Sequence, residues 1–361
     1  MSTYMNAYGA SGAKFNLFRW SVDNCAFKLW DTISTSNNRY LVQEGTWGDQ
    51  LVQALRNNGF RINMAIFGFD VPFLRKESLA TEAEKDAVRR YINYVVARYG
   101  AYVDIWELMN EAPPWPVDTF PKNIWNDWLT FASDYLRSID SYKHLISTNW
   151  ERGDFAKIDI QSPHWYETES ELVSDLRTVE MINSSKTWNK PVIFGEQGNS
   201  VCNWDDHSAL RMRIRSWTSF FTEGVLTFWN SSFAKDYCPV TPAPANLYIG
   251  SVERNYIRIL QDFLSDAPAD LISGHAYVSD TSRVRGLVLR GSNTALAYLH
   301  AFTDHTNPTS GVFLTLDIPI NGTATWINPA TGETISTVSV SAGMQTISIP
   351  AFTIDVALKI K

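Results

Sequence analysis

Two glutamates, each at the end of a short apolar segment, are the side chains best placed to do acid–base chemistry. The run that starts at Val103 ends at Asn110 and Glu111, and a second run from Pro191 reaches Glu196 between two glycines. An apolar run that stops at a carboxylate and a Pro-rich loop is typical of a buried parallel strand whose carboxyl end opens onto that loop. Carboxylates at such strand ends are candidates for an acid, a base or a nucleophile.

Hydrolysis of a glycosidic bond requires two carboxyl groups that face each other across a cleft. One carboxylic acid protonates the leaving oxygen, and the other carboxylate attacks the sugar or activates water. The matching positions of Glu111 and Glu196 at strand ends, rather than their separation in sequence, favour this chemistry. The structural alternative for Glu111 is a cap on the next helix or an ion pair with an arginine.

Further polar and aromatic side chains close other predicted strands. In chain order they are Arg19, the pair Asn149 and Trp150, whose side chains are compatible with a sugar contact, the pair His164 and Tyr166, and Trp229. An arginine at such a position can hold a carboxylate through a forked hydrogen bond. His164 and Tyr166 are two residues apart, so they share one face of a strand. A core histidine with both ring nitrogens paired is the alternative for His164.

Strand-like and helix-like segments alternate through the first 265 residues. The predicted strands span residues 15–20, 61–68, 103–111, 144–150, 158–166, 191–198 and 224–230, and the predicted helices span 43–59, 81–99, 124–139, 170–184, 207–222 and 251–263. Thr81 and Glu84 form a capping-box pattern, and Asn58-Gly59 is a helix-ending signal. These alternations with right-handed connections predict a TIM-type (β/α)8 barrel. The first strand of the barrel is not evident, because residues 3–12 have the pattern of a helix.

The pattern changes near residue 270. Short segments with alternating apolar and polar residues follow one another, separated by Gly, Asn and Pro turns. They span residues 285–290, 294–301, 312–316, 322–327, 335–340, 346–349 and 355–360. We therefore expect a barrel domain over residues 1–268 and a small antiparallel β-sandwich domain over 269–361. Packing against the barrel is the simpler role for the sandwich, and sugar binding is the alternative.

Composition excludes several classes of partner. The chain of 361 residues has a formal net charge of −7, a pI near 5.4 and no basic stripe, which argues against a nucleic-acid surface. No apolar run of about 18 residues predicts a membrane span, and no signal peptide is visible. Export with a leader outside this sequence stays open, so the location is not predicted. Aromatic residues make up 13%, which weakly favours a carbohydrate ligand.

The cysteines do not predict a metal site. Cys25, Cys202 and Cys238 are an odd number without CxxC or metal-ligand spacing. A disulfide between Cys202 and Cys238 and three inert thiols fit the sequence equally well. We expect no metal and no organic cofactor, and the sequence does not predict the oligomeric state.

The placed motifs resemble those of clan A glycoside hydrolases, most closely the family 5 cellulases and mannanases. The resemblance covers about residues 13–265. It implies a retaining reaction in which Glu111, after Asn110, is the acid/base and Glu196 is the nucleophile. It also implies that Arg19 and Tyr166 hold Glu196, that Asn110 contacts the sugar 2-hydroxyl, that His164 orients its neighbours and that Trp229 forms a platform for a sugar ring. One of the two carboxyl groups is then expected to stay protonated near neutral pH.

The substrate implied by the resemblance is a β-linked polysaccharide or oligosaccharide. Endo-β-1,4-glucanase activity is the first expectation, followed by β-mannanase and exo-acting β-glycosidase activity. Candidate walls of sugar subsites are Trp30, Trp47, Trp115, Trp150, Trp165 and Trp204. A non-catalytic carbohydrate-binding barrel is the alternative from another class. A lyase or aldolase would need a lysine or a metal cluster at the strand ends, and the sequence shows neither there.

Overall fold

The computed structural model describes most of the chain. The described residues are 1–22, 27–30, 40–68, 81–111, 122–149, 152–200, 205–229 and 249–361. They divide into two compact units, residues 1–164 with 185–196 and residues 165–184 with 197–361. No helix in the described ranges is long and apolar enough to span a membrane. Trp115, Trp150, Trp204 and the three cysteines lie outside the described residues.

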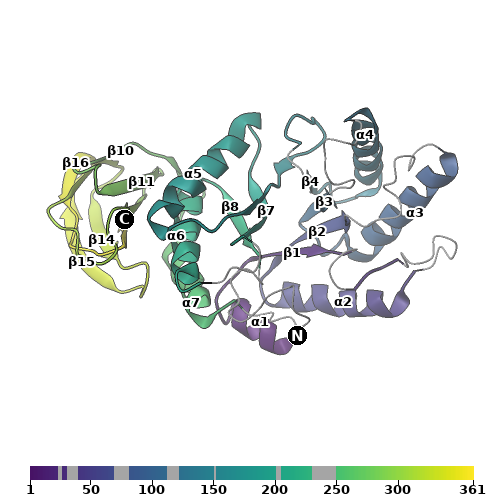
Figure 1. Ribbon diagram of the computed structural model, residues 1–361, viewed down its shortest axis with the longest axis horizontal. Helices are drawn as coiled ribbons and strands as arrows, with labels where there is room; N and C mark the ends of the chain where they lie inside the picture. The colour runs from purple at the N-terminus through teal and green to yellow at the C-terminus, as the bar shows by residue number, and fades with distance from the viewer. Residues whose placement is uncertain are drawn as a thin grey trace. The chain divides into compact units, whose positions relative to one another are not determined.

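The first unit is a parallel α/β structure. Its elements are α1 (Ser2–Tyr8), β1 (Leu17–Ser21), α2 (Val42–Asn57), β2 (Arg61–Phe67), α3 (Glu82–Tyr99), β3 (Ile105–Met109), α4 (Lys122–Ile139), β4 (Leu145–Thr148), β5 (Ile160–Gln161) and the short 3-10 helix η3 (Lys186–Trp188). Strands β1 to β5 form one sheet in sequence order, and each neighbouring pair is parallel. Figure 1 shows α2, α3 and α4 packed along this sheet. The carboxyl ends of its strands therefore meet at one edge.

Local sequence accounts for these elements. Every residue of β2 except the first is buried, as expected for a strand covered on both faces. Helix α3 begins at the predicted capping box, in which Thr81 and Glu84 satisfy each other's backbone N–H groups. Residues 1–16 contain α1 and turns but no strand, in agreement with the helical pattern of residues 3–12.

One predicted strand is wrong in its extent. The segment 158–166 forms two short strands, β5 and β6 (His164–Tyr166), rather than one. Pro163 lies between them and has no backbone N–H to donate to a sheet ladder. Strand β6 belongs to a second sheet with β7 (Ile193–Gly198) and β8 (Val225–Phe228), in the order β6-β7-β8. The break thus moves His164 out of the five-stranded sheet.

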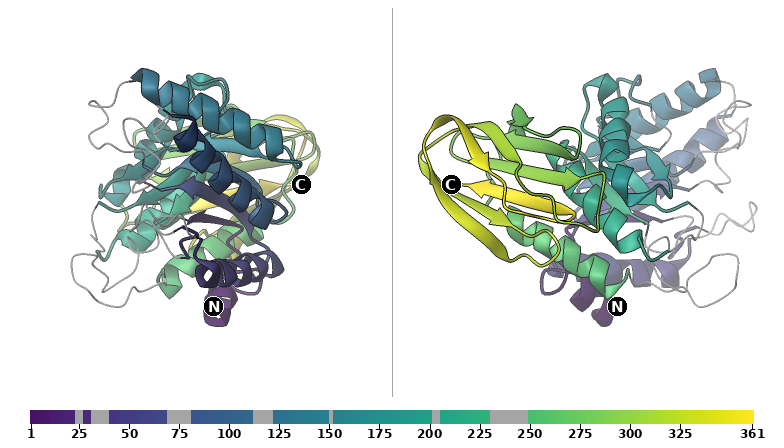
Figure 2. Two further views of the ribbon diagram at one scale, coloured as in Figure 1. Left: turned by 90° about the vertical axis from the view of Figure 1, so that its right-hand side faces the viewer. Right: turned by 60° about the vertical axis from the view of Figure 1, so that its left-hand side comes forward.

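The second unit contains the C-terminal β-sandwich. Its helices are η2 (Glu171–Val173), α5 (Ser174–Ser185), α6 (Ser208–Phe221) and α7 (Ser251–Leu264), and its sandwich strands are β9 (Ile272–Ser273), β10 (Ala276–Val278), β11 (Val284–Arg290), β12 (Ala295–Ala301), β13 (Phe313–Ile318), β14 (Gly322–Ile327), β15 (Thr334–Val340), β16 (Gly343–Ser348) and β17 (Asp355–Ile360). One sheet has the order β10-β13-β16 and the other β15-β14-β17-β12-β11-β9. Figure 2 shows these green-to-yellow strands in two layers. The predicted antiparallel sandwich is confirmed, with β9 and β10 added to the predicted strands.

The sandwich has a core of its own and a second apolar face. Alternate residues of both sheets, such as Leu314 and Leu358, fill the space between the layers. The outer face of the six-stranded sheet packs against α6 and α7, where the Trp217 ring stacks on Tyr298 with centroids 5.6 Å apart. Packing, the simpler role expected for this module, is therefore what the outer face does within the second unit.

Candidate active site

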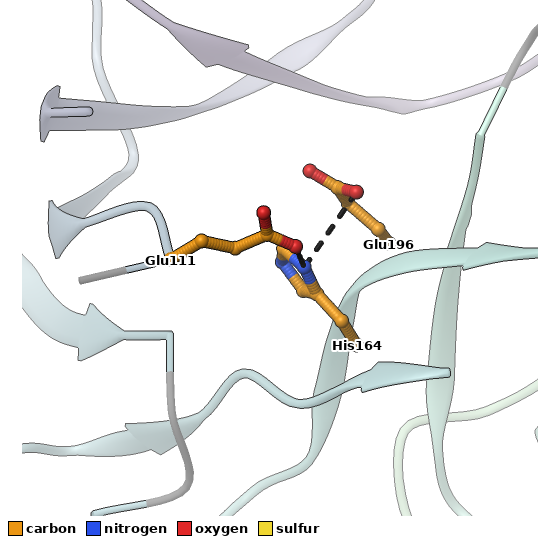
Figure 3. A group of neighbouring side chains, drawn as sticks. All are labelled: Glu111, His164 and Glu196. Atoms are coloured by element: carbon orange, nitrogen blue, oxygen red, sulfur yellow. Dashed lines mark hydrogen bonds and ion pairs between the residues drawn. The ribbon is translucent and has the colours of Figure 1, made fainter. Parts of the chain in front are cut away.

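Glu111, which follows β3, His164, the first residue of β6, and Glu196, inside β7, converge at one place in the structure. His164 Nδ1 lies 2.9 Å from Glu111 Oε1 and 3.5 Å from Glu196 Oε2. One oxygen of each carboxylate and this nitrogen all lie within 4.8 Å of one another. Figure 3 shows the two carboxylates approaching the imidazole from different segments of the chain. The two predicted carboxylates are thus neighbours, at a separation close to the roughly 5–5.5 Å of a retaining pair.

Arg19 forms hydrogen bonds with Glu196, the nucleophile candidate, and with Asn110. Its Nη1 donates to Glu196 Oε1 at 2.8 Å, and its Nη2 donates to Asn110 Oδ1 at 2.7 Å. Burial disfavours the guanidinium charge, but Glu107 and Glu196 outweigh that effect and raise the pKa of Arg19 above its usual value. Arg19 therefore stays charged and holds Glu196 in one orientation.

The forked hydrogen bond of Arg19 goes to Glu107, a residue that the sequence interpretation did not single out. Arg19 Nε and Nη2 donate to the two oxygens of Glu107 at 2.7 and 2.5 Å. Glu107 is completely buried in β3, and Asn63 Nδ2 also contacts it at 3.4 Å. The signal in the sequence is a glutamate inside an otherwise apolar strand. Such a charge is almost never fully buried unless it is paired.

His164 sets the charge of Glu111. The hydrogen bond from His164 lowers the pKa of Glu111, burial opposes this, and the charges of His164 and Arg19 add to it, so the pKa lies below its usual value. In the free protein Glu111 therefore favours the carboxylate form. This direction is opposite to the expectation that the acid keeps its proton near neutral pH without substrate.

Replacing His164 by asparagine is expected to raise the pKa of Glu111 toward its ordinary value, because the largest stabilising contact of the carboxylate is lost. A lowered folded-state pKa contributes stability above the ordinary glutamate pKa, and that contribution disappears as the pH falls through the lowered value. NMR titration of the labelled Glu111 carboxyl carbon, assigned with Glu111→Gln, measures the shift. An unchanged midpoint in His164→Asn would contradict the assigned cause.

Gly195 has no side chain, and this leaves room beside it for the side chains of Ser162, His164 and Arg19. A methyl group built on Gly195 would lie 2.7 Å from Ser162 Oγ, 3.0 Å from His164 Nε2 and 3.2 Å from Arg19 Nε. Contacts this short would force the imidazole and the guanidinium to move. The glycine before Glu196 is therefore required by close packing of the site.

Gly195→Ala is expected to lower kcat/KM by about 10- to 100-fold, because displacement of catalytic groups by about 1 Å can cost that much. The fall is measured against Gly274→Ala, where a methyl group would lie no closer than 3.2 Å to its nearest neighbour. Circular dichroism of both variants separates misplacement from unfolding. A Gly195→Ala protein with wild-type kcat/KM would show that the site tolerates the methyl group.

Two predicted aromatic site residues lie together in the second unit. The rings of Tyr166 and Trp229 meet edge to face with centroids 6.4 Å apart, and both side chains are exposed. Exposed aromatic rings that are fixed by a neighbour are suited to stacking on a sugar. Trp150, the third predicted aromatic binding residue, lies outside the described residues.

Three other sequence interpretations are corrected. Trp30 and Trp165 are buried, so they are core residues and not walls of a subsite, whereas Trp47 is exposed. Asn149 is also buried, with its side-chain amide bonded to the backbone at Glu111 and Ser162. Asn149 therefore does not face a sugar, because local backbone groups take up its hydrogen bonds.

Glu111, His164 and Glu196 are also a group whose donor atoms are spaced to hold a metal ion, within the part of the chain that the structure describes. Two carboxylates and an imidazole suit a divalent cation such as zinc. The Arg19 guanidinium already contacts Glu196 at 2.8 Å, however, and a second positive charge there would be repelled. The arrangement is better suited to proton transfer and nucleophilic attack than to metal binding.

The fold is similar to that of solved glycoside hydrolase structures. A protein described as a glycoside hydrolase matches over 99% of this chain and 87% of its own, with 15% identity and a TM-score of 0.64. A GH30 endoxylanase from Clostridium papyrosolvens C71 matches over 100% of this chain and 93% of its own, with 11% identity and a TM-score of 0.57. This chain has the fold of TIM-barrel glycoside hydrolases with a C-terminal β-sandwich. A GH5-4 broad-specificity endoglucanase from Clostridium longisporum matches over 72% of this chain and 85% of its own, with 14% identity and a TM-score of 0.54.

The similarity therefore extends over both the parallel α/β region and the C-terminal sandwich, as in the GH30 structure. It includes GH5 and GH30 proteins alike, so it does not single out family 5. No family model matches the sequence, and no curated protein does. At these identities the likeness shows the fold, and the chemistry is argued from the site.

Proposed function

We propose that this protein is a retaining glycoside hydrolase that cleaves a β-linked polysaccharide or oligosaccharide. The observation that carries the proposal is the pair Glu111 and Glu196, from separate strands, with carboxylate oxygens within 4.8 Å of one another through a shared histidine. Residues 1–268 would form the catalytic domain and residues 269–361 the small sandwich domain. No cofactor is needed, because both steps use carboxyl groups and water.

Glu196 is the proposed nucleophile. Its side chain is 9% exposed, and its Oε1 accepts a hydrogen bond from Arg19 Nη1 at 2.8 Å. A Glu196 oxygen attacks the anomeric carbon as the bond to the leaving oxygen breaks, which gives a covalent glycosyl–enzyme. Asn110, whose Oδ1 accepts a hydrogen bond from Arg19 Nη2, is proposed to contact the 2-hydroxyl of the same sugar.

Glu111 is the proposed acid and base. Its side chain is 40% exposed in the free protein, so a sugar that covers it removes water from the carboxylate. Desolvation disfavours the charged form, and Glu111 then takes up the proton that it gives to the leaving oxygen. In the second step the Glu111 carboxylate accepts a proton from water, whose oxygen attacks the anomeric carbon and releases Glu196.

Tyr166 and Trp229 are proposed to contact the substrate. Their exposed rings offer a platform for a sugar face, and Trp150 is proposed for the same role from the sequence. The first candidate activity is endo-β-1,4-glucanase, and β-mannanase and exo-acting β-glycosidase follow. The resemblance to clan A motifs and the neutral character of these substrates support this order.

The test is turnover of β-glucan, β-mannan, β-xylan and aryl β-glycosides, with proton NMR of the first product formed. Release of the β-anomer first would support retention, and the α-anomer first would contradict the short carboxylate separation. Glu196→Gln serves as an inactive control on every substrate, and Glu111→Gln serves as an inactive control on the polysaccharides. Binding of a polysaccharide by all three proteins without turnover by any would instead support a non-catalytic binding barrel.

A further inference from the structure

The backbone of Glu111 has an unusual conformation. Its φ is +45°, in the left-handed region, where a residue with a side chain is disfavoured relative to glycine. Such conformations persist only where the surroundings fix them, and they often occur at functional sites. The backbone conformation of Glu111 determines where its carboxylate points, so the group that fixes this backbone also directs the carboxylate.

The group that holds this backbone is the side-chain amide of Asn149. The backbone N–H of Glu111 donates to Asn149 Oδ1 at 3.2 Å. Asn149 is 2% exposed, and its own backbone N–H donates to Met109 O at 3.0 Å, which fixes it to the end of β3. The acceptor that Glu111 uses is therefore itself rigidly placed.

The same amide also fixes the segment that carries His164. Asn149 Nδ2 donates to Ser162 O at 3.0 Å, two residues before His164. His164 Nδ1 in turn contacts Glu111 Oε1 at 2.9 Å. These contacts close a ring that runs from the Glu111 backbone through Asn149 and residues 162–164 to the Glu111 side chain.

An asparagine is chemically required at this place in the ring. The amide offers an acceptor to the Glu111 N–H and a donor to the Ser162 carbonyl at the same time. Aspartate keeps the acceptor but faces the Ser162 carbonyl with a second oxygen, and alanine offers neither group. A change of either kind therefore opens the ring without touching a catalytic carboxylate.

We propose that Asn149 is a positioning residue for acid/base catalysis, which it supports by holding both the backbone of Glu111 and the His164 segment. This inference rests on the proposed function, in which Glu111 is the acid and base. It assigns Asn149 a role different from the sugar contact expected from the sequence.

The test uses Asn149→Ala and Asn149→Asp with two aryl β-glycosides, one with a 2,4-dinitrophenyl leaving group and one with a phenyl leaving group. Phenolate is the poorer leaving group and needs a proton from Glu111, whereas 2,4-dinitrophenolate does not. We expect kcat/KM for the phenyl glycoside to fall about 10- to 100-fold. For the dinitrophenyl glycoside we expect kcat/KM to fall by less than about 3-fold, because this leaving group does not need a proton from Glu111. The small fall that remains is the effect of misplaced groups apart from acid assistance. Equal falls on both substrates, or none, would overturn the assignment.

Asp140→Ala is the matched control. Asp140 lies in the turn before β4, whereas Asn149 follows the other end of that strand. Asp140 accepts hydrogen bonds from the backbone N–H groups of Tyr142 and His144. Its loss is expected to lower stability while leaving the ratio of the two kcat/KM values unchanged. If Asp140→Ala changed that ratio as the Asn149 variants do, general destabilisation would explain the result and the assignment would fail.

A readout independent of turnover separates this inference from the proposed function. Opening the ring lengthens the Glu111–His164 contact, so the NMR titration midpoint of Glu111 is expected to rise in Asn149→Ala, which removes both ring contacts and adds no charge beside Glu111. A wild-type protein that turns over no glycoside would overturn the proposed function, yet the midpoint would still report whether Asn149 positions Glu111. An unchanged midpoint in an active protein would overturn the positioning role alone.

Discussion

Glu196→Gln is expected to lower kcat/KM by about 10⁴- to 10⁶-fold on every substrate, the range found when a catalytic nucleophile is removed. A glutamine oxygen does not form the covalent intermediate, although it is the same size and can still accept the Arg19 hydrogen bond. Folding is therefore expected to be preserved, and the loss is measured with both poor and activated aryl glycosides.

The uniform loss separates the two glutamates. Removal of the acid Glu111 spares kcat/KM for a substrate with an activated leaving group, whereas removal of the nucleophile spares none. Glu180→Gln is a matched control, because Glu180 is a surface glutamate whose ion pair with Arg177 lies on α5. Residual activity of Glu196→Gln near that of the control would refute the nucleophile assignment. A further check is Glu196→Ala with azide, which is expected to give the glycosyl azide of inverted configuration.

Glu107→Ala is expected to destabilise the protein by about 3–5 kcal/mol, the cost of removing one partner from a buried ion pair. Arg19 would remain buried. Among the contacts found at its guanidinium, Glu196 would then be the single carboxylate partner. Chemical denaturation of the wild type and the variant measures the difference. We also expect lower activity, because an Arg19 free of Glu107 is no longer fixed beside the nucleophile.

Two comparisons sharpen this prediction. Glu107→Gln keeps one acceptor for Arg19, so its cost is expected to fall to about 1–3 kcal/mol. The double replacement of Arg19 by methionine and Glu107 by leucine removes both charges, and it is expected to cost less than the sum of the single changes. A loss in Glu107→Ala that is no larger than that of an exposed ion pair, about 1 kcal/mol, would contradict the importance of this buried contact.

The register of the strands in the five-stranded sheet explains why Arg19 reaches Glu107. In the parallel register, Arg19 of β1 is opposite Asn63 of β2, and Asn63 is opposite Ile105 of β3. Glu107 lies two residues further along β3, on the same face as Ile105. The side chains of Arg19 and Glu107 together span the roughly 10 Å between strands that are two apart, so this pairing depends on the register of three strands.

The sequence by itself determined the elements and the positions of the two glutamates. Strand and helix signals are local, because side-chain periodicity, the Thr81–Glu84 capping box and glycine turns act within a few residues. The same locality predicted that Glu111 follows a strand, and it predicted the sandwich strands, whereas Glu196 lies inside β7 rather than at its end. It failed at residues 158–166, where Pro163 divides what the apolar pattern presented as one strand.

The tertiary structure alone decided which side chains meet. The pairing of Arg19 with Glu107, the closed ring through Asn149 and the lowered pKa of Glu111 each join residues far apart in the chain. Such contacts are set by strand register and by the path of the backbone, which no local pattern records. The sequence could therefore point to the two proposed catalytic carboxylates. The direction in which each one points depends on partners that only folding brings within hydrogen-bonding distance.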